Sequence, residues 1–459
     1  MDEVFNKSKK LIKESWKPLL VVFGVGLVSY GSSFLELLYN NDGLIRVVQD
    51  HQGYQDALSK GRWFYPLVYN SINGQFRVPM MSGLISLVFV CVSSLLIWRL
   101  FDIQSNEKRV LIGSIFVSTP ILIHFFFYLG DAEVYSTGML MMVTSAWFWF
   151  GKKGVWKGFA VLLAVCALAC YPALFSFHLT LVVAIILHLY MSQTNIALKH
   201  YVLSVCFPLV SLAVYFVLTK VLVSVSGVDM TSYRNADEIS IIGLLQNFPG
   251  QIRIVVYNLK ANLLNGPLVD LLFVLLALIS LSISIRKQAS LLRKIIGLFL
   301  FVVMALSTLS VFYITYENSY YPGFGFGYIV FYTAIGHFVL RSEKKWVIGL
   351  GGLLIIGVLF QNARHNNAIT VKHQLSAEAA KEIVSQLMMD IQAQEGYKKG
   401  DKVFIVGDPV KNPNLDFVEL TEVYTAQNGL KKWPVGFSGY SVYRKLQMTS
   451  HLLGQKMNF

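Results

Sequence analysis

Acidic residues at the ends of apolar segments are the side chains of this chain that could do chemistry. Only 14% of its 459 residues are charged, so a carboxylate beside an apolar run stands out. Asp42, Asp131 and Glu317 each come at or just beyond the end of such a run, and Glu133 follows Asp131 closely. Because an ionisable group at a membrane edge is costly unless it is hydrated or paired, we expect these carboxylates to gather in one cavity.

Carboxylates that meet beside cations and aromatic rings suit sugar transfer at a membrane surface. A carboxylate can serve as general base for an acceptor hydroxyl while the sugar passes through an oxocarbenium-like state and its bond from C1 to phosphate breaks. The departing phosphate needs cations, and the planar fork of arginine suits it. The candidate cations and stacking residues on the same side of the predicted membrane are Arg46, Arg62, Arg253, Lys260, Trp63, Tyr65, Tyr135 and Tyr320.

Several of these residues also fit simpler roles. Asp42 could cap a following helix, since Asp is favoured at that position. Asp131 and Glu133 could form a solvated turn. Arg62 could extend its charged end to the membrane surface beside Trp63.

Glu317 is expected to bind substrate rather than to act in catalysis. Three histidines in apolar runs, His124, His178 and His188, lack the paired spacing of metal ligands, so we expect neither a metal nor another cofactor. The four cysteines also lie inside apolar runs without metal-ligand spacing, and we interpret them as buried small hydrophobic residues without disulfides.

The elements that must position these residues are membrane-spanning helices. Hydrophobic residues make up 55% of the chain, and apolar runs near twenty residues recur, each long enough to cross about 30 Å of hydrocarbon. We predict an α-helical polytopic membrane protein with about eleven spans. They cover residues 19–38, 80–100, 110–129, 134–150, two spans within 155–191, 201–225, 267–285, 295–315, 327–340 and 346–360.

The distribution of positive charge predicts the orientation. The assigned cytoplasmic segments hold about nineteen Lys and Arg, and the assigned outer loops before the last hundred residues hold about seven. The net charge of +13 is therefore explained by topology, and no nucleic-acid partner is expected. The N-terminus is placed in the cytoplasm, and the two long loops, 39–79 and 226–266, are placed in the periplasm.

The chain changes character near residue 362. Residues 1–361 form the predicted transmembrane domain, whose loop 226–266 has the mixed helical spacing of an amphipathic interfacial helix. Residues 362–459 begin with a helical pattern and continue with "KVFIVGDP", typical of a buried strand and a turn. We predict a small soluble α/β domain there, in the periplasm by span count.

Three short motifs carry a family resemblance. "NNDGLIR" after the first predicted span, "GRW" at residues 61–63 and the acidic "YLGDAEVYS" resemble the bacterial serotype-converting glucosyltransferases that modify O-antigen, within the GT-C class of multi-spanning glycosyltransferases. The resemblance covers residues 19–151. It implies a GT-C-like fold, Asp42 as the catalytic acid of the first loop, Asp131 or Glu133 as the acidic patch of the second, and Arg62 as the motif arginine.

The same resemblance implies the partners and the location. The donor would be glucose on undecaprenyl phosphate, the acceptor a lipid-linked O-antigen unit of lipopolysaccharide, and the site would face the periplasm from the bacterial inner membrane. Separate proteins would synthesise and flip the donor. The chain departs from the family pattern in two places, because Asn41 precedes Asp42 where paired aspartates are expected, and "ENSYYPGFG" lacks an arginine beside its proline.

Two other functions fit the same composition. One is a GT-C transferase that acts on lipid A, protein or a teichoic-type polymer; the other is a flippase or transporter of lipid-linked sugars. A transporter would place ionisable residues at mid-membrane, whereas nearly every acid here lies at a span end. We therefore predict an enzyme in which Asp42 is the general base or its orienting partner, and Asp131 and Glu133 bind sugar hydroxyls or share the base role.

Overall fold

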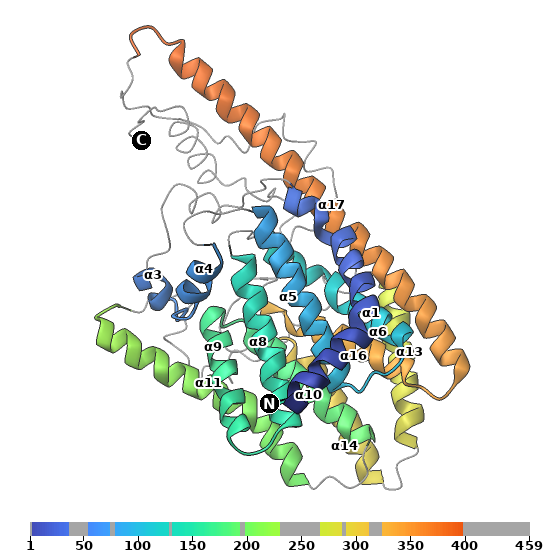
Figure 1. Ribbon diagram of the computed structural model, residues 1–459. Helices are drawn as coiled ribbons and strands as arrows, with labels where there is room; N and C mark the ends of the chain where they lie inside the picture. The colour runs from blue at the N-terminus through green and yellow to red at the C-terminus, as the bar shows by residue number, and fades with distance from the viewer. Residues whose placement is uncertain are drawn as a thin grey trace.

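The protein is a bundle of helices, shown in Figure 1. The computed structural model describes residues 2–35, 54–73, 79–127, 131–192, 198–229, 267–286, 291–311 and 324–397, and contains no strand within them. The helices are α1 (Asp2–Leu35), α3 (Tyr54–Ser59), α4 (Tyr65–Asn73), α5 (Pro79–Leu100), α6 (Asn106–Ser118), η1 (Pro120–Leu122), α7 (Ile123–Phe127), α8 (Ala132–Gly151), α9 (Val155–Cys170), α10 (Leu174–Ser192), α11 (Leu198–Ser226), α13 (Pro267–Arg286), α14 (Leu291–Ser307), α16 (Gly327–Leu340) and α17 (Lys345–Gln392).

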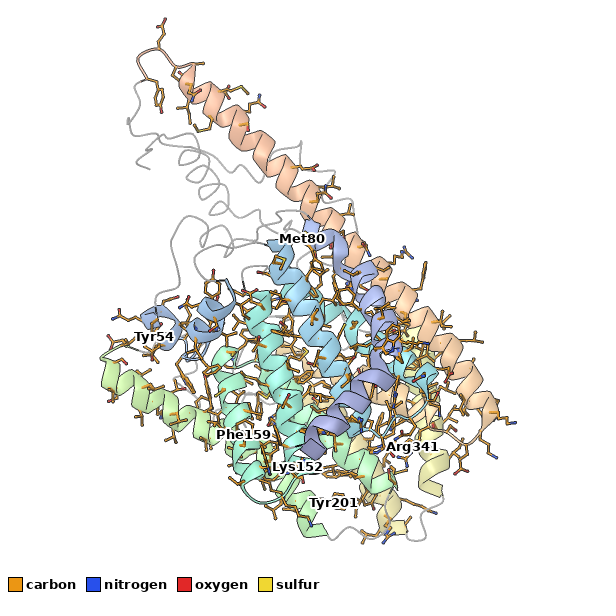
Figure 2. All side chains as sticks on the ribbon, viewed as in Figure 1. Tyr54, Met80, Lys152, Phe159, Tyr201 and Arg341 are labelled. Carbon is orange, nitrogen blue, oxygen red and sulfur yellow. The ribbon has the colours of Figure 1, made fainter. Side chains whose placement is uncertain are left out.

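The bundle has two ends, which we name by residues labelled in Figure 2. Tyr54 and Met80 mark the Met80 end, and Lys152, Tyr201 and Arg341 mark the Arg341 end. Helix α5 runs from the Met80 end to the Arg341 end. Helix α8 has 20 residues, about 30 Å, and connects Asp131 to Lys152 at the Arg341 end. Asp131 therefore lies at the Met80 end, together with α3 and α4.

Each of the eleven stretches predicted to span the membrane contains helix in the described residues. Five described helices are long and apolar enough to cross a membrane alone, or six if α6 and the following bent segment form one span. The five are segments of α1, α5, α10, α11 and α17, and α9, α13 and α16 contribute shorter apolar helices. The helical polytopic architecture is confirmed, whereas the count of eleven crossings stays a prediction.

The region 155–191 folds as two helices, as predicted. Helix α9 ends at Cys170, and Tyr171 adopts an extended conformation (φ −155°, ψ 105°) before Pro172. A residue before proline is disfavoured in the α conformation, so this sequence ends the helix. Since α9 begins near Lys152 and α10 ends beside the Arg341 end, the break holds Tyr171 at the Met80 end.

Helix α8 lies at the centre, where it packs against α5 and α9. Small residues on α9, Ala160, Ala164 and Ala167, are fully buried and allow close approach of the two helices. The Ser145 hydroxyl donates a hydrogen bond to the Ala160 carbonyl oxygen at 2.7 Å. This packing fixes the helix that carries Asp131.

Apolar side chains remain exposed on the outer helices, as a membrane protein requires. On α11 and α14 they include Val202, Leu203, Leu209, Val210, Val217, Val221, Leu291, Leu292, Ile295, Leu298, Phe299 and Val302. Cys206 is also exposed on α11, and Cys166 is partly exposed, so the prediction that all four cysteines are buried holds only for Cys91 and Cys170. The reason for Cys206 is that α11 packs only part of its surface against neighbouring helices.

Helix α17 continues without a break through the predicted domain boundary at residue 361. Its 48 residues span about 72 Å, and it projects beyond the bundle on the side where α3 and α4 lie (Figure 1). No Gly or Pro occurs between residues 358 and 392, so nothing in the sequence ends the helix there. The predicted strand near residue 403 and the amphipathic helix within 230–266 lie outside the described residues.

Close packing at the start of α16 gives a test of the fold. A Cβ on Gly327 would lie 2.6 Å from the Thr308 Cα and 2.9 Å from the Ser176 carbonyl oxygen, and backbone atoms cannot rotate away. We expect Gly327→Ala to lower the free energy of unfolding by about 1–3 kcal/mol, measured by thermal unfolding of the purified protein.

The control is Gly349→Ala, where no atom lies within 4 Å of the added Cβ on α17. It should be neutral or should stabilise the protein by up to about 1 kcal/mol through helix propensity. Equal loss of stability in both variants would contradict the packing described for α16.

Candidate active site

Six of the candidate acids, cations and stacking residues that the sequence singles out lie in the described part of the chain. They lie at the Met80 end, on α8, on α4 and on the turn between α3 and α4, and are Arg62, Trp63, Tyr65, Asp131, Glu133 and Tyr135. Outside the described residues lie Asp42, Arg46, Arg253, Lys260, Glu317 and Tyr320. The candidate site consists of residues of the first group and their neighbours.

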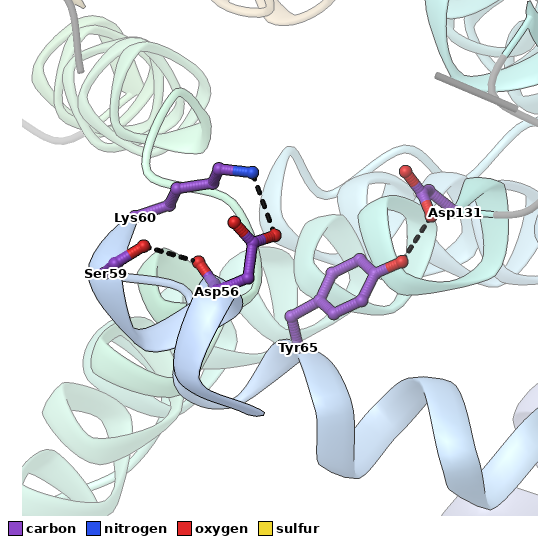
Figure 3. A network of polar contacts seen from close by, with 5 residues as sticks. All are labelled: Asp56, Ser59, Lys60, Tyr65 and Asp131. Atoms are coloured by element: carbon purple, nitrogen blue, oxygen red, sulfur yellow. Dashed lines mark hydrogen bonds and ion pairs between the residues drawn. The ribbon is translucent and has the colours of Figure 1, made fainter. Parts of the chain in front are cut away.

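Asp131 is a buried carboxylate held by two tyrosines. It occupies the N-cap position of α8, but its side chain makes no capping hydrogen bond. One carboxylate oxygen accepts a short hydrogen bond from the Tyr65 hydroxyl (Figure 3), and the other accepts one from the Tyr135 hydroxyl at 3.2 Å. Because only 1% of Asp131 is exposed, these bonds offset the cost of burying its charge.

Glu133 lies in the first turn of the same helix and is fully buried. The alternative of a solvated acidic turn at Asp131 and Glu133 is therefore wrong. Asp131 lies at the N-cap and Glu133 in the first turn of α8, and residues two apart on a helix do not face each other.

The turn between α3 and α4 is fixed against two transmembrane helices. Gly61 has a positive φ of 72°, and a Cβ there would overlap the Tyr215 hydroxyl, which donates to the Gly61 carbonyl oxygen at 3.0 Å. The Trp63 indole N–H donates to the Thr219 hydroxyl at 3.1 Å. The Phe64 backbone N–H donates to the end of α9. These contacts place Tyr65 over α8.

Arg62 reaches the same cluster through aromatic rings. Its guanidinium lies 5.0 Å from the centre of the Tyr171 ring, and that ring lies 4.6 Å from the ring of Tyr135. Phe326, from just before α16, packs against Tyr171 at 5.9 Å. Arg62, predicted from "GRW", and Asp131, predicted from "GDAEVYS", are therefore connected through two aromatic rings, Tyr171 and Tyr135.

A second acid on this end is used differently. The Asp56 carboxylate pairs with Lys60 at 2.9 Å on one turn of α3, and Ser59 donates to the Asp56 carbonyl oxygen (Figure 3). This ion pair is partly exposed and closes the short helix. It contrasts with Asp131, whose carboxylate joins α4 to α8.

The arrangement can bind a hydroxyl-rich ligand. A sugar hydroxyl donates a hydrogen bond to a carboxylate as a tyrosine hydroxyl does, so the position that Tyr65 occupies on Asp131 is one that a substrate hydroxyl could take. The rings of Tyr135 and Tyr171 lie beside it, both buried and packed against each other. Within the described ranges no group of three His, Cys, Asp or Glu side chains is placed to hold a metal ion.

Sequence reasoning missed part of this site. Tyr65 was expected to stack on a sugar, whereas its hydroxyl holds Asp131 and its ring stacks on Tyr69. Tyr135 is four residues after Asp131, so helical spacing could have indicated its hydrogen bond. The proline that follows Tyr171 was the one feature of the sequence that indicated a break in the helix at this residue. No feature of the sequence indicated that Tyr215 and Thr219 contact the site.

The comparisons with known proteins agree with the region of the site. A family model described as "Glucosyl transferase GtrII" matches residues 31–338, which is more than half of the chain. The matched range begins in α1, includes α3, α4 and α8, and ends in α16. No curated protein and no solved structure matches the chain.

The Tyr65 bond to Asp131 can be tested by removing one oxygen atom. We expect Tyr65→Phe to lower the free energy of unfolding by about 1.5–3 kcal/mol, because the buried carboxylate loses a donor. Tyr135→Phe removes another donor to the same carboxylate and should also lower the free energy of unfolding. Thermal unfolding of the full-length protein in detergent measures both changes.

Tyr30→Phe is the matched control. The buried Tyr30 hydroxyl donates to the neutral Thr119 carbonyl oxygen at 2.7 Å, so its removal should cost about 0.5–1.5 kcal/mol. A Tyr30→Phe loss equal to or larger than that of Tyr65→Phe would show that Asp131 does not depend on the tyrosine.

Proposed function

The chain belongs to the glucosyl transferase GtrII family, and from this premise we propose that it moves glucose from undecaprenyl-phosphate-glucose to lipid-linked O-antigen units of lipopolysaccharide. The observation that carries the site assignment is the buried Asp131 carboxylate beside aromatic rings and Arg62. The enzyme acts from the bacterial inner membrane, on its periplasmic side. Separate proteins synthesise the donor and flip it across the membrane.

The charge difference between the two ends supports this orientation. Lys and Arg collect in cytoplasmic connections of membrane proteins. By the bounds of the helices that end or begin there, the Arg341 end carries Arg99, Lys108, Arg109, Lys152, Lys153, Lys157, Arg293, Lys294, Arg341, Lys344 and Lys345. That end is therefore proposed to face the cytoplasm, and the Asp131 site the periplasm. Since α17 projects on the side of α3 and α4, the C-terminal part is proposed to be periplasmic too.

In the proposed reaction a carboxylate takes the proton of the acceptor hydroxyl. The acceptor oxygen forms a bond to C1 of glucose as the bond from C1 to the phosphate oxygen breaks, and its electron pair leaves with the phosphate. Asp42 is proposed as the general base or its orienting partner. Asp131 and Glu133 bind sugar hydroxyls or share the base role, and the tyrosine bonds of Asp131 suit the first of these.

Cations stabilise the departing polyprenyl phosphate. Arg62 is proposed for this role together with Arg253 or Lys260, with Arg46 as a further contact. The Tyr171 ring lies against the Arg62 guanidinium and limits the orientations of that group. The site is proposed to lie close to the membrane surface, where a lipid-linked phosphate lies. Trp63, Glu317 and Tyr320 are proposed to contact the sugars.

A flippase or transporter of lipid-linked sugars is the alternative from another class. It would need ionisable groups along a path through mid-membrane. In the described helices the buried acids Asp131, Glu133 and Asp270 instead lie at the cap or in the first turn of a helix. This placement favours the enzyme. A transferase that acts on lipid A, protein or a teichoic-type polymer would share the site and differ only in acceptor.

The test of function is a new glucose branch on the surface polysaccharide. Cells that carry the protein should gain this branch, detected as a hexose mass difference in the repeat unit or by serum reactivity. Asp42→Asn should abolish the gain while expression and membrane insertion stay intact, because an amide cannot act as general base.

Asp56→Asn provides the control for this experiment. Asp56 lies near the same end but pairs with Lys60, so its loss should leave glucose transfer within about twofold of wild type, as expected for an exposed ion pair. Wild-type transfer by Asp42→Asn would remove Asp42 from the mechanism. A polysaccharide that gains no hexose with the wild-type protein would refute the O-antigen acceptor.

A further inference from the structure

A cavity lies at the Arg341 end, on the side of the bundle away from Asp131. Its volume is about 650 Å³, within the range of ligand pockets in proteins. It lies where the connection from α5 to α6 meets the ends of α10 and α16. None of the residues assigned to sugar transfer lines it, so the proposed reaction leaves this cavity without a role.

The cavity carries more positive than negative charge. Arg99, Lys108 and Arg341 line it, against one acid, Asp102. Partial burial lowers the pKa of the Arg341 guanidinium, and the nearby Asp102 carboxylate raises it. Two positive charges remain after Asp102 is counted, and the cavity lies beside low-dielectric protein, where such charges attract an anion more strongly than in water.

Two buried histidines hold Arg341 in place. The His188 Nδ1 and His337 Nε2 atoms lie 2.9 Å apart, and an Arg341 nitrogen lies 3.4 Å from the same Nδ1 and 3.4 Å from the His188 carbonyl oxygen. Arginine only donates, so a bond from Arg341 to Nδ1 requires the His188 tautomer in which Nδ1 carries no proton, and in that tautomer His337 Nε2 donates between the rings. Phe101 stacks on His337 at 4.9 Å and completes the wall.

The start of α6 also borders the cavity. Ser105 is the N-cap of this 13-residue helix and accepts a hydrogen bond from the Lys108 backbone N–H. Both residues line the cavity. The Glu107 carboxylate in the first turn accepts a hydrogen bond from the Ser105 hydroxyl and offsets the partial positive charge of this helix end, so the attraction for an anion comes from the side-chain cations.

We propose that this cavity binds a phosphate group, either the head group of an anionic phospholipid or free phosphate. The volume exceeds that of one phosphate and leaves room for a glycerol head group. The position at the membrane edge, between transmembrane helices and on the positively charged end, favours the lipid. The site is separate from sugar transfer, and the inference does not depend on the proposed donor or acceptor.

The test uses the full-length protein in a nonionic detergent and measures the shift of melting temperature with ligand. Three probes are compared: dioctanoyl phosphatidylglycerol, inorganic phosphate and dioctanoyl phosphatidylcholine as the zwitterionic control. Phosphatidylglycerol should raise the melting temperature, and Arg341→Gln should weaken its apparent affinity about tenfold, the effect of one lost charge-assisted contact. Lys108→Gln, at a partly exposed position, should also weaken the affinity, and this variant is the test if Arg341→Gln does not fold.

Lys153→Gln is the control, because Lys153 lies at the same end but does not line the cavity. A shift with phosphatidylglycerol alone supports the lipid head group, and a shift with inorganic phosphate as well supports free phosphate. A shift with phosphatidylcholine equal to that with phosphatidylglycerol would overturn the proposal. So would the absence of any shift, or an equal loss of affinity in Lys153→Gln.

Discussion

The need to hydrogen-bond one buried carboxylate connects the parts of the candidate site. Asp131 begins α8 inside an apolar bundle, where a charge without partners would cost several kcal/mol. Tyr135 on its own helix supplies one donor, and Tyr65 supplies the other from a segment 66 residues earlier. The docking of α4 on α8 is therefore tied to the charge on Asp131. The turn at Gly61 and the Trp63 bond to Thr219 hold that docking in place.

The molecule has two chemically different ends. At the Met80 end, acids and aromatic rings surround a site that suits hydroxyl groups. At the Arg341 end, the cations of the short connections surround a cavity that suits phosphate. Helices of about 30 Å separate the two. A lipid-linked sugar has both a hydroxyl-rich and a phosphate part, and in the proposed function both parts bind at the Met80 end, with Arg62 and the predicted basic residues of the outer loops on the phosphate.

Much of the fold follows from hydrophobic pattern and charge. The limits of α16 agree with the predicted span at both residues, and the proline after Tyr171 correctly indicated two helices in place of one. Helix α17 continues past residue 360, where the drop in hydropathy favours a domain boundary, and that boundary stays a prediction. A polar helix continues as well as an apolar one when no Gly or Pro ends it. The number of membrane crossings is harder to predict, because short helices such as α9 can be buried by neighbouring helices rather than by lipid.

The site was predictable only in part. Scarcity made Asp131 and Glu133 conspicuous in the sequence, and a motif indicated Arg62. Sequence could not show that Tyr65 reaches Asp131, because that contact depends on how α4 docks after the "GRW" turn. Nor could it show that Tyr171 lies between Arg62 and Tyr135, since this results from the packing of three helices. Local patterns identify the charged residues of a site better than the neutral ones that orient them.

The position of a bound donor tests the central claim most directly. Cryo-electron microscopy of the full-length protein in lipid nanodiscs with undecaprenyl-phosphate-glucose would show it. The account predicts that glucose lies at the Met80 end with a hydroxyl about 3 Å from an Asp131 carboxylate oxygen, in the position that the Tyr65 hydroxyl now occupies. Glucose bound at the Arg341 end, or at the Met80 end with Asp131 still enclosed by Tyr65 and out of reach, would contradict it.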